Sequence, residues 1–435
     1  MFYTESCPIN KIREAKNIMN ILWQLKIIGW RAIEVIFTIA MYCWGWFFPD
    51  PTILDGPGAI KKLPAIVKKK GKDNVLVVTD KGLMSLNLLD GLFKALDEAG
   101  VKYTLYDEVQ PNPTVQNVEE ALNLYNSNGC KAVIAVGGGS PMDCAKGVIA
   151  RVARPDRPVK KMKGTFMVFL PSKGMNGLIP PPLYAVPTTA GTGSETTIAA
   201  VITDVETHNK FPIMDPFIRA RYAVLDPELT AGLPKKITST TGMDAMTHAV
   251  EGYTNIWYND KKFNDYGLKA IKLIFENLEK AYNNGNDLEA RGNMLLASYY
   301  AGLCFTRGGV GYVHGIGHRL GGLYHVPHGL AMSVILPHVF DDCFLGPYVE
   351  DKLAEIADYV GITGATNREK AHNFIAEVRA MNERMEIPTG FDCIEDKDIP
   401  WIAKECLAEV MPTYPVKKVF TQAEVERFIA NEIKQ

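Results

Sequence analysis

Residues 132–140 read AVIAVGGGS, and they carry the clearest indication of the fold class. Its first five residues, Ala132 to Val136, are apolar and predict a buried β-strand. Three glycines and Ser140 follow directly, and Pro141 then opens a helical pattern that runs to Ala150. A glycine run between a buried strand and a helix indicates one unit of an α/β sheet.

The segments on either side repeat this alternation. Strands are predicted at residues 75–78, 103–106 and 183–186, and helices at 83–99 and 115–127. Strands that alternate with helices predict a parallel sheet. We therefore expect a Rossmann-like α/β domain over residues 49–225.

Helical patterns dominate from Asp226 onward and predict an all-α second domain over residues 226–435. They cover Ile237–Tyr253, Asp265–Tyr282, Leu288–Phe305, Tyr348–Val360, Asn367–Met385 and Gln422–Lys434. A chain of 435 residues is long enough for two domains.

Residues 1–48 form a separate N-terminal extension that holds four of the six tryptophans. Within residues 18–48 the polar side chains fall in one narrow stripe, which predicts an amphipathic helix. Its uncharged part is shorter than the roughly 20 apolar residues that span a bilayer. We expect contact with a membrane surface, with packing on protein as the alternative; a cleaved signal peptide fits less well.

The composition suits a soluble globular enzyme, because 47% of the residues are hydrophobic and 22% are charged. A net charge of −2 gives no reason to expect a nucleic-acid partner. The eight cysteines form no CxxC pair, so we expect a reducing, cytoplasmic location.

Two loops that follow strands are suited to binding phosphate and ribose. In Gly137–Ser140, here called the glycine cradle, bare backbone N–H groups and a helix N-terminus can meet a pyrophosphate. Pro187–Glu195, the threonine loop, offers hydroxyl groups. Asp80 ends a strand, where a carboxylate can bind the ribose and favour NAD over NADP. Taken singly, a tight turn, a capping loop and a turn aspartate remain alternative interpretations.

Two i, i+4 pairs and one further histidine indicate a metal site. Asp244 and His248 share one face of an apolar helix, where a buried carboxylate and imidazole must be paired or metal-bound. His314 and His318 repeat the spacing, and His328 lies in a Pro-His-Gly turn. One carboxylate with several imidazoles suits Fe(II), Zn(II) or a similar ion, whereas a lone pair would more often be structural.

Together these motifs resemble the iron-containing (group III) alcohol dehydrogenase family. The matching segments are Pro111–Thr114, Gly137–Ser140, Pro187–Glu195, Thr241–His248 and His314–Gly329. The resemblance implies a dinucleotide-binding α/β domain and a helical domain that carries the catalytic metal. It also implies an assembly of at least two identical subunits.

The resemblance also assigns roles to single residues. It makes Asp244, His248, His314 and His328 the ligands of Fe(II), with Zn(II) as the alternative ion. His318 becomes a catalytic histidine near the nicotinamide that can relay a proton. The implied NAD contacts are Asp80, Asn112, Gly138, Gly139, Ser140, Asp143, Thr188, Thr189, Thr192, Lys210 and Leu229.

Three features depart from the family pattern. Ala199 stands where some members have a cofactor-contacting asparagine, and Arg319 stands where a small or neutral residue is common. We interpret Arg319 as a structural arginine in preference to an anion-binding one. The N-terminal 48 residues have no counterpart in the typical member.

The activity that follows is reversible hydride transfer between NAD(H) and a primary alcohol or aldehyde, diols and hydroxyaldehydes included. Two alternatives remain at this stage. A sugar-phosphate cyclase of the dehydroquinate-synthase type would need a basic cluster, but only Arg319 is basic around His314 to His328. An inactive membrane-tethered scaffold would not need the intact set of ligand residues.

Overall fold

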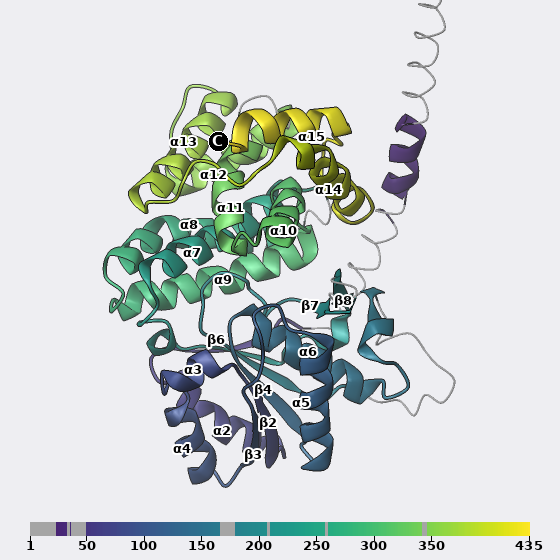
Figure 1. The fold of residues 1–435 in the computed structure, drawn as a ribbon. Helices are drawn as coiled ribbons and strands as arrows, with labels where there is room; N and C mark the ends of the chain where they lie inside the picture. Colours follow the sequence, from purple (N-terminus) through teal and green to yellow (C-terminus); the bar gives the residue numbers. More distant parts are fainter. Residues whose placement is uncertain are drawn as a thin grey trace, which may run out of the picture.

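The computed structural model describes residues 23–32, 35, 49–165, 179–206, 209–256, 260–341 and 346–435. Its α/β part lies at the bottom of Figure 1 and its helical part at the top. The two-domain fold predicted from the sequence is confirmed. The exact boundaries at residues 48/49 and 225/226 stay a prediction.

Six parallel strands form the main sheet, in the order β1-β9-β6-β4-β2-β3. They are β1 (Thr52–Asp55), β2 (Asn74–Val78), β3 (Lys102–Tyr106), β4 (Ala132–Gly137), β6 (Leu183–Pro187) and β9 (Tyr222–Leu225). A smaller sheet has the order β5 (Gly164–Thr165), β8 (Asn209–Met214) and β7 (Ala199–Asp204).

Helices cover both faces of the main sheet, which is why β4 is apolar at every position. These helices are α2 (Ala59–Lys69), α3 (Lys81–Ser85), α4 (Asp90–Glu98), α5 (Val115–Ser127) and α6 (Gly139–Ala153). Alternate side chains point to opposite faces. Val133 and Ala135 belong to the core under α5 and α6, and Ile134 and Val136 to the core under α2 and α4.

Two local predictions are corrected in this domain. The single helix expected over residues 83–99 is split into α3 and α4, because Asn87 between them takes a left-handed backbone with φ 55°. The helix after the glycine cradle begins at Gly139, so Pro141 lies inside its first turn instead of opening it.

The helical domain surrounds one large apolar core. Its helices are α7 (Lys235–Thr254), α8 (Lys261–Asn283), α9 (Leu288–Gly308), α10 (Tyr312–Tyr324), α11 (His328–Val339), α12 (Pro347–Val360), α13 (Asn367–Arg384), α14 (Ile399–Thr413) and α15 (Gln422–Phe428). The predicted helix 422–434 ends as α15, and a π-helical turn, Ile429–Ile433, follows it. The sequence patterns did not predict α10, α11 or α14.

The threonine loop meets the helical domain by close backbone packing against α9. A Cβ atom on Gly193 would lie 2.7 Å from Gly302 Cα, so a side chain there would push α9 away. The Gly193 N–H also donates to Ser298 Oγ at 3.2 Å. This contact fixes the loop relative to the helices that carry the predicted metal ligands.

Of the predicted N-terminal helix, only residues 23–32 and 35 are described, and they are helical; the rest of 18–48 lies outside the described residues. Arg31 Nη2 donates to the carbonyls of Val416 at 2.7 Å and Lys417 at 3.0 Å. Trp23 and Trp30 pack against the helical core. Among the described residues, no helix combines the length and apolarity that a bilayer crossing needs.

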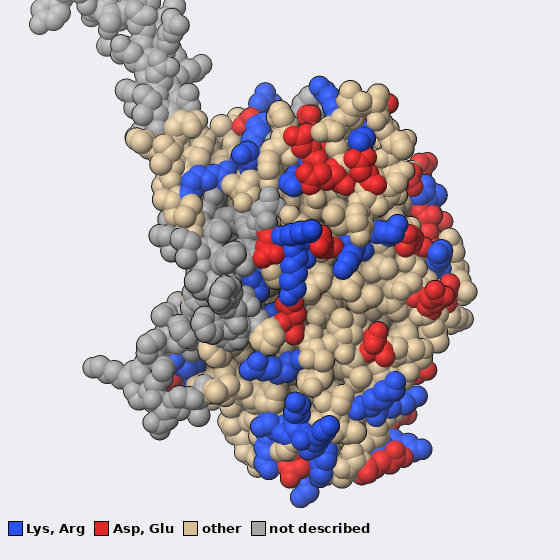
Figure 2. Space-filling model, turned by 180° about the vertical axis from the view of Figure 1, so that it is seen from behind, with Lys and Arg blue, Asp and Glu red and all other residues tan. Residues whose placement is uncertain are grey.

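Charges are unevenly distributed over the face in Figure 2. Basic and acidic side chains mix over the helical part, and basic ones gather at the lower end, which is the α/β domain.

Candidate metal centre and nucleotide site

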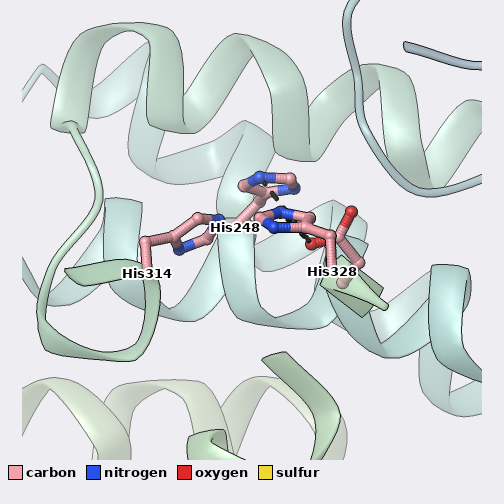
Figure 3. Close-up of side chains that lie close together, drawn as sticks. His248, His314 and His328 are labelled. Atoms are coloured by element: carbon pink, nitrogen blue, oxygen red, sulfur yellow. Dashed lines mark ion pairs between the residues drawn. The ribbon is translucent and has the colours of Figure 1, made fainter. Parts of the chain in front are cut away.

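The four predicted ligands converge from three helices of the second domain. Asp244 and His248 lie one turn apart on α7, His314 lies in the first turn of α10, and His328 begins α11. One ligand atom from each residue lies within 4.8 Å of all the others. Figure 3 shows the three imidazoles facing a common centre. The structure therefore brings together residues that span more than eighty positions of sequence.

The cluster is deeply buried on three sides. Asp244, His248 and His314 are at most 5% exposed, while the His328 side chain is 43% exposed and leaves one side accessible. His314 Nε2 is buried without a hydrogen-bond partner among the described residues, and Asp244 Oδ1 has an ion-pair contact with His328 Nε2 at 3.4 Å but no well-formed hydrogen bond. Such unsatisfied atoms cost about 1–3 kcal/mol each. A divalent cation would satisfy both, and one carboxylate with three imidazoles suits Fe(II) or Zn(II).

Burial sets the protonation of the cluster. It lowers the pKa of His248 to about 3 and that of His314 well below its usual value, so both imidazoles stay neutral, as metal ligands must be. Burial alone would raise the pKa of Asp244, but the neighbouring His248 and His328 hold it well below its usual range. Burial opposes charge on His328 as well, yet Asp244, 3.4 Å away, raises its pKa.

A second carboxylate, Glu251, orients one of these imidazoles from behind. Its Oε2 lies 2.5 Å from His314 Nδ1, and its Oε1 accepts the Val313 N–H at 2.8 Å. This contact leaves His314 Nε2 facing the centre. Glu251 is not among the residues predicted from the sequence, although it lies seven residues after Asp244 and three after His248 and so shares their helical face.

His318 lies beside the four residues without joining them. Its ring stacks on that of His328 at 5.4 Å between centroids, and its Nδ1 lies 2.7 Å from Glu409 Oε1 on α14. Glu409 also accepts a hydrogen bond from Arg319, which agrees with our structural interpretation of that arginine. No sequence pattern singles out Glu409, because α14 brings it to the site from 91 residues away.

The predicted nucleotide-binding loops lie side by side at the carboxyl edge of the main sheet. Gly137 pairs with Pro187, and the Thr188 N–H donates to Gly137 O at 3.0 Å. A Cβ atom on Gly139 would lie 3.4 Å from Thr192 Cγ2, and one on Gly138 equally close to Thr189 Oγ1. Bare glycine backbone therefore keeps the space between the two loops open.

Three further predicted contacts meet at this edge. Lys210 Nζ donates to Asn112 Oδ1 at 2.8 Å, and the Asn112 N–H donates to Ser140 Oγ at 3.3 Å. Asp80 lies two residues after the neighbouring strand β2, and its carboxylate caps α3 by accepting the Leu83 N–H at 3.0 Å.

Two other predicted contacts have mainly internal partners. The Asp143 carboxylate accepts Ser194 Oγ–H at 3.0 Å and the Val201 N–H at 2.9 Å. Leu229 ends a short 3₁₀ helix, Pro227–Leu229, and packs in the core under α2 and α4. Their contact with the cofactor stays a prediction.

The threonine loop connects the nucleotide site to the metal cluster. Gly191 O lies 3.3 Å from His248 Nδ1, which leaves Nε2 of that ring for the centre. Lys210 interacts electrostatically with His328 and works against charge on it. A nucleotide held at the sheet edge would thus extend toward the metal ligands.

Comparison with known proteins agrees with this geometry. Residues 50–227 match the family described as iron-containing alcohol dehydrogenase, and residues 238–432 match its C-terminal part. The NAD-dependent methanol dehydrogenase of Bacillus methanolicus is 35% identical over 393 residues, covering 89% of this chain and 99% of that protein. The 1,3-propanediol dehydrogenase of Klebsiella pneumoniae is 37% identical, covering 81% and 90%.

Solved structures give the same result. A crystal structure of 1,3-propanediol oxidoreductase superposes with a TM-score of 0.81 at 33% identity, covering 88% of this chain and 98% of that one. An alcohol dehydrogenase from Oenococcus oeni gives 0.79 at 32% identity, covering 88% and 99%.

These matches confirm the predicted resemblance, and they favour an iron-type, NAD-dependent dehydrogenase over the cyclase and scaffold alternatives. Both halves of the chain match consecutive parts of one family, and relatives above 30% identity align along nearly their whole length. The chain therefore belongs to the iron-containing alcohol dehydrogenase family.

Proposed function

We propose that this iron-type dehydrogenase transfers hydride reversibly between NAD(H) and a small primary alcohol or diol, or the corresponding aldehyde. The observation that carries the proposal is the convergence of Asp244, His248, His314 and His328 within 4.8 Å. The substrate class follows from relatives named as methanol dehydrogenase, 1,3-propanediol dehydrogenase and lactaldehyde reductase.

The four residues would hold Fe(II), with Zn(II) as the alternative ion. When bound, the metal supplies Lewis acidity that lowers the pKa of an alcohol oxygen or polarises a carbonyl. The exposed side of His328 leaves room for substrate, and Phe305, stacked on His248 at 4.1 Å, is an apolar neighbour of the centre. His318 would carry the proton that leaves or reaches the substrate oxygen.

The nucleotide would bind along the carboxyl edge of the main sheet. The glycine cradle and Thr188, Thr189 and Thr192 would hold its phosphates, and Lys210 with Asn112 its nicotinamide half. The Asp80 carboxylate would accept the adenosine ribose hydroxyls and repel a 2′-phosphate. This arrangement supports NAD over NADP.

The test combines metal analysis with turnover. Freshly purified protein should contain about one equivalent of iron or zinc per chain if the four residues form a single site. It should reduce NAD with methanol, ethanol or 1,3-propanediol, measured by NADH absorbance. Metal-loaded protein that turned over no alcohol or aldehyde with NAD(H) or NADP(H) would refute the proposal.

We further propose a cytoplasmic enzyme whose N-terminal helix contacts a membrane surface. Leu25 and Ile28 are 59% and 63% exposed, whereas Trp23 and Trp30 pack on the helical domain. The exposed pair lies three residues apart, so both can face lipid.

Co-sedimentation with phosphatidylcholine–phosphatidylserine vesicles tests the membrane contact. Leu25→Asp/Ile28→Asp should release the protein from the vesicles. Ile179→Asp, which alters an apolar residue of the α/β domain that is 72% exposed, should not. Equal recovery of all three proteins in the supernatant would favour packing on protein.

Family membership also supports a homodimer or larger homo-oligomer. Size-exclusion chromatography with light scattering tests this, and a mass of one 48.2 kDa chain would contradict it.

A further inference from the structure

His318, the predicted proton carrier, contacts a group of side chains that are not among the proposed ligands of the metal or of NAD. Glu409 lies at the centre of this group, on α14, with its side chain 20% exposed. Its Oε1 lies 2.7 Å from His318 Nδ1 and accepts the Tyr414 hydroxyl at 2.5 Å. Its Oε2 accepts a hydrogen bond from Arg319.

The contacts of Glu409 determine which ring nitrogen of His318 carries the hydrogen and which one is left without a hydrogen-bond partner from this group. Burial would raise the pKa of Glu409, but His318, Tyr414 and Arg319 outweigh it and lower the pKa to about 2. An ionised carboxylate only accepts hydrogen bonds, so His318 must present Nδ1–H to it. The free nitrogen is then Nε2, on a ring that packs against both His314 and His328.

Arg319 and Tyr414 hold the Glu409 carboxylate in place beside His318. Arg319 follows His318 on α10, and Tyr414 caps the end of α14, so the carboxylate is fixed from both helices.

We propose that Glu409, held by Arg319 and Tyr414, is the positioning residue that fixes His318 with Nδ1–H toward α14 and Nε2 available to the substrate oxygen. This inference rests on the proposed role of His318 as proton carrier. Glu409 itself touches neither substrate nor the reacting atoms. Its removal should slow turnover through His318 and leave metal and NAD binding intact.

Steady-state kinetics of Glu409→Gln, His318→Ala and the double variant test this. Glu409→Gln should lower kcat by about 10- to 100-fold, the range typical of second-layer partners of an active-site imidazole. The KM for NAD and the metal content should stay within about twofold of wild type, since Glu409 acts on His314 and His328 only through its charge, and its hydrogen bonds go to His318, Arg319 and Tyr414. In the His318→Ala background, Glu409→Gln should have no further effect, because the residue it positions is gone.

Tyr414→Phe provides a second variant that keeps the carboxylate, in case Glu409→Gln does not fold. It should lower kcat about 2- to 10-fold, since one of three hydrogen bonds to Glu409 is lost. Glu355→Gln is the matched control. Glu355 accepts a tyrosine hydroxyl at 2.6 Å and pairs with Lys352 at 2.8 Å, as Glu409 does with its partners. This control should leave kcat unchanged.

The outcomes distinguish a failure of the positioning role from a failure of the proposed function. If His318→Ala lost activity while Glu409→Gln kept wild-type kcat, the inference would be wrong and the proposed function would stand. A Glu409→Gln loss that persisted in full in the His318→Ala background would also overturn it. Full activity of His318→Ala would overturn the proposed role of His318, and the positioning role with it.

Discussion

Replacing Glu251 by glutamine should weaken metal binding without unfolding the protein. In the wild type, one carboxylate oxygen accepts the Val313 N–H at 2.8 Å and the other lies 2.5 Å from His314 Nδ1. Glutamine has one acceptor oxygen and one NH₂ group. If the oxygen keeps Val313, the NH₂ group faces His314 and favours the tautomer with hydrogen on Nε2, which cannot bind a metal.

The magnitude follows from the bond that is lost. A hydrogen bond to a charged partner contributes about 1.5–3 kcal/mol, which corresponds to a weakening of metal affinity by about 10- to 100-fold. Outer carboxylate partners of metal-bound histidines show the same range of about 10- to 100-fold. The metal-free protein should change less, because burial raises the pKa of Glu251 to about 7 and glutamine removes a charge that burial disfavours.

Titration of Zn(II) against a fluorescent chelator measures the affinity of both proteins. Glu195→Gln is the matched control, because Glu195 is equally buried at 1% exposure and burial raises its pKa to about 7 as well, without contact to the ligands. Thermal unfolding of the metal-free proteins tests folding. Equal Zn(II) dissociation constants for wild type and Glu251→Gln, with both folded, would refute the reasoning.

Chelation should lower the unfolding midpoint of the wild type, since metal at 100 times its Kd adds about 2.7 kcal/mol of stability; the midpoint of Asp244→Asn should not respond, as calorimetry with and without EDTA will show. Glu195 holds an extra proton in the folded state between its usual pKa near 4.5 and about 7, so wild-type stability falls as pH rises through this window. In Glu195→Gln that fall should be absent, so the free energy of unfolding at pH 8 relative to pH 5 should be higher than in wild type by at most about 3 kcal/mol. Urea unfolding that gave the same pH dependence for both proteins would contradict this. Asp80→Ser keeps a capping oxygen for the Leu83 N–H but removes the negative charge. The ratio of kcat/KM for NADP to kcat/KM for NAD should then rise about tenfold or more, because repulsion between the Asp80 carboxylate and the 2′-phosphate, which can cost up to several kcal/mol, is lost. An unchanged cofactor ratio would show that Asp80 does not face the ribose.

Most of the fold could be predicted from short-range patterns. The apolar run Ala132–Val136 predicts a strand buried on both faces, as β4 is, and the strands on either side of it follow the same alternation with helices. The prediction failed where one residue changes the backbone locally. Asn87 divides the helix expected over residues 83–99, and its left-handed conformation leaves no mark on the hydrophobic pattern.

The candidate ligands followed from local spacing together with the family resemblance. Asp244 and His248 share a helical face at i, i+4, and polar side chains in such an apolar helix need a partner. Glu251, on the same face, could have been found by the same argument. The contacts of the carboxylates with these histidines, by contrast, are seen only in the packed helices. Glu251 contacts His314, and Glu409 reaches His318 from α14, a helix that the sequence patterns did not predict. Helix packing, which no local spacing encodes, determines which histidine each carboxylate orients.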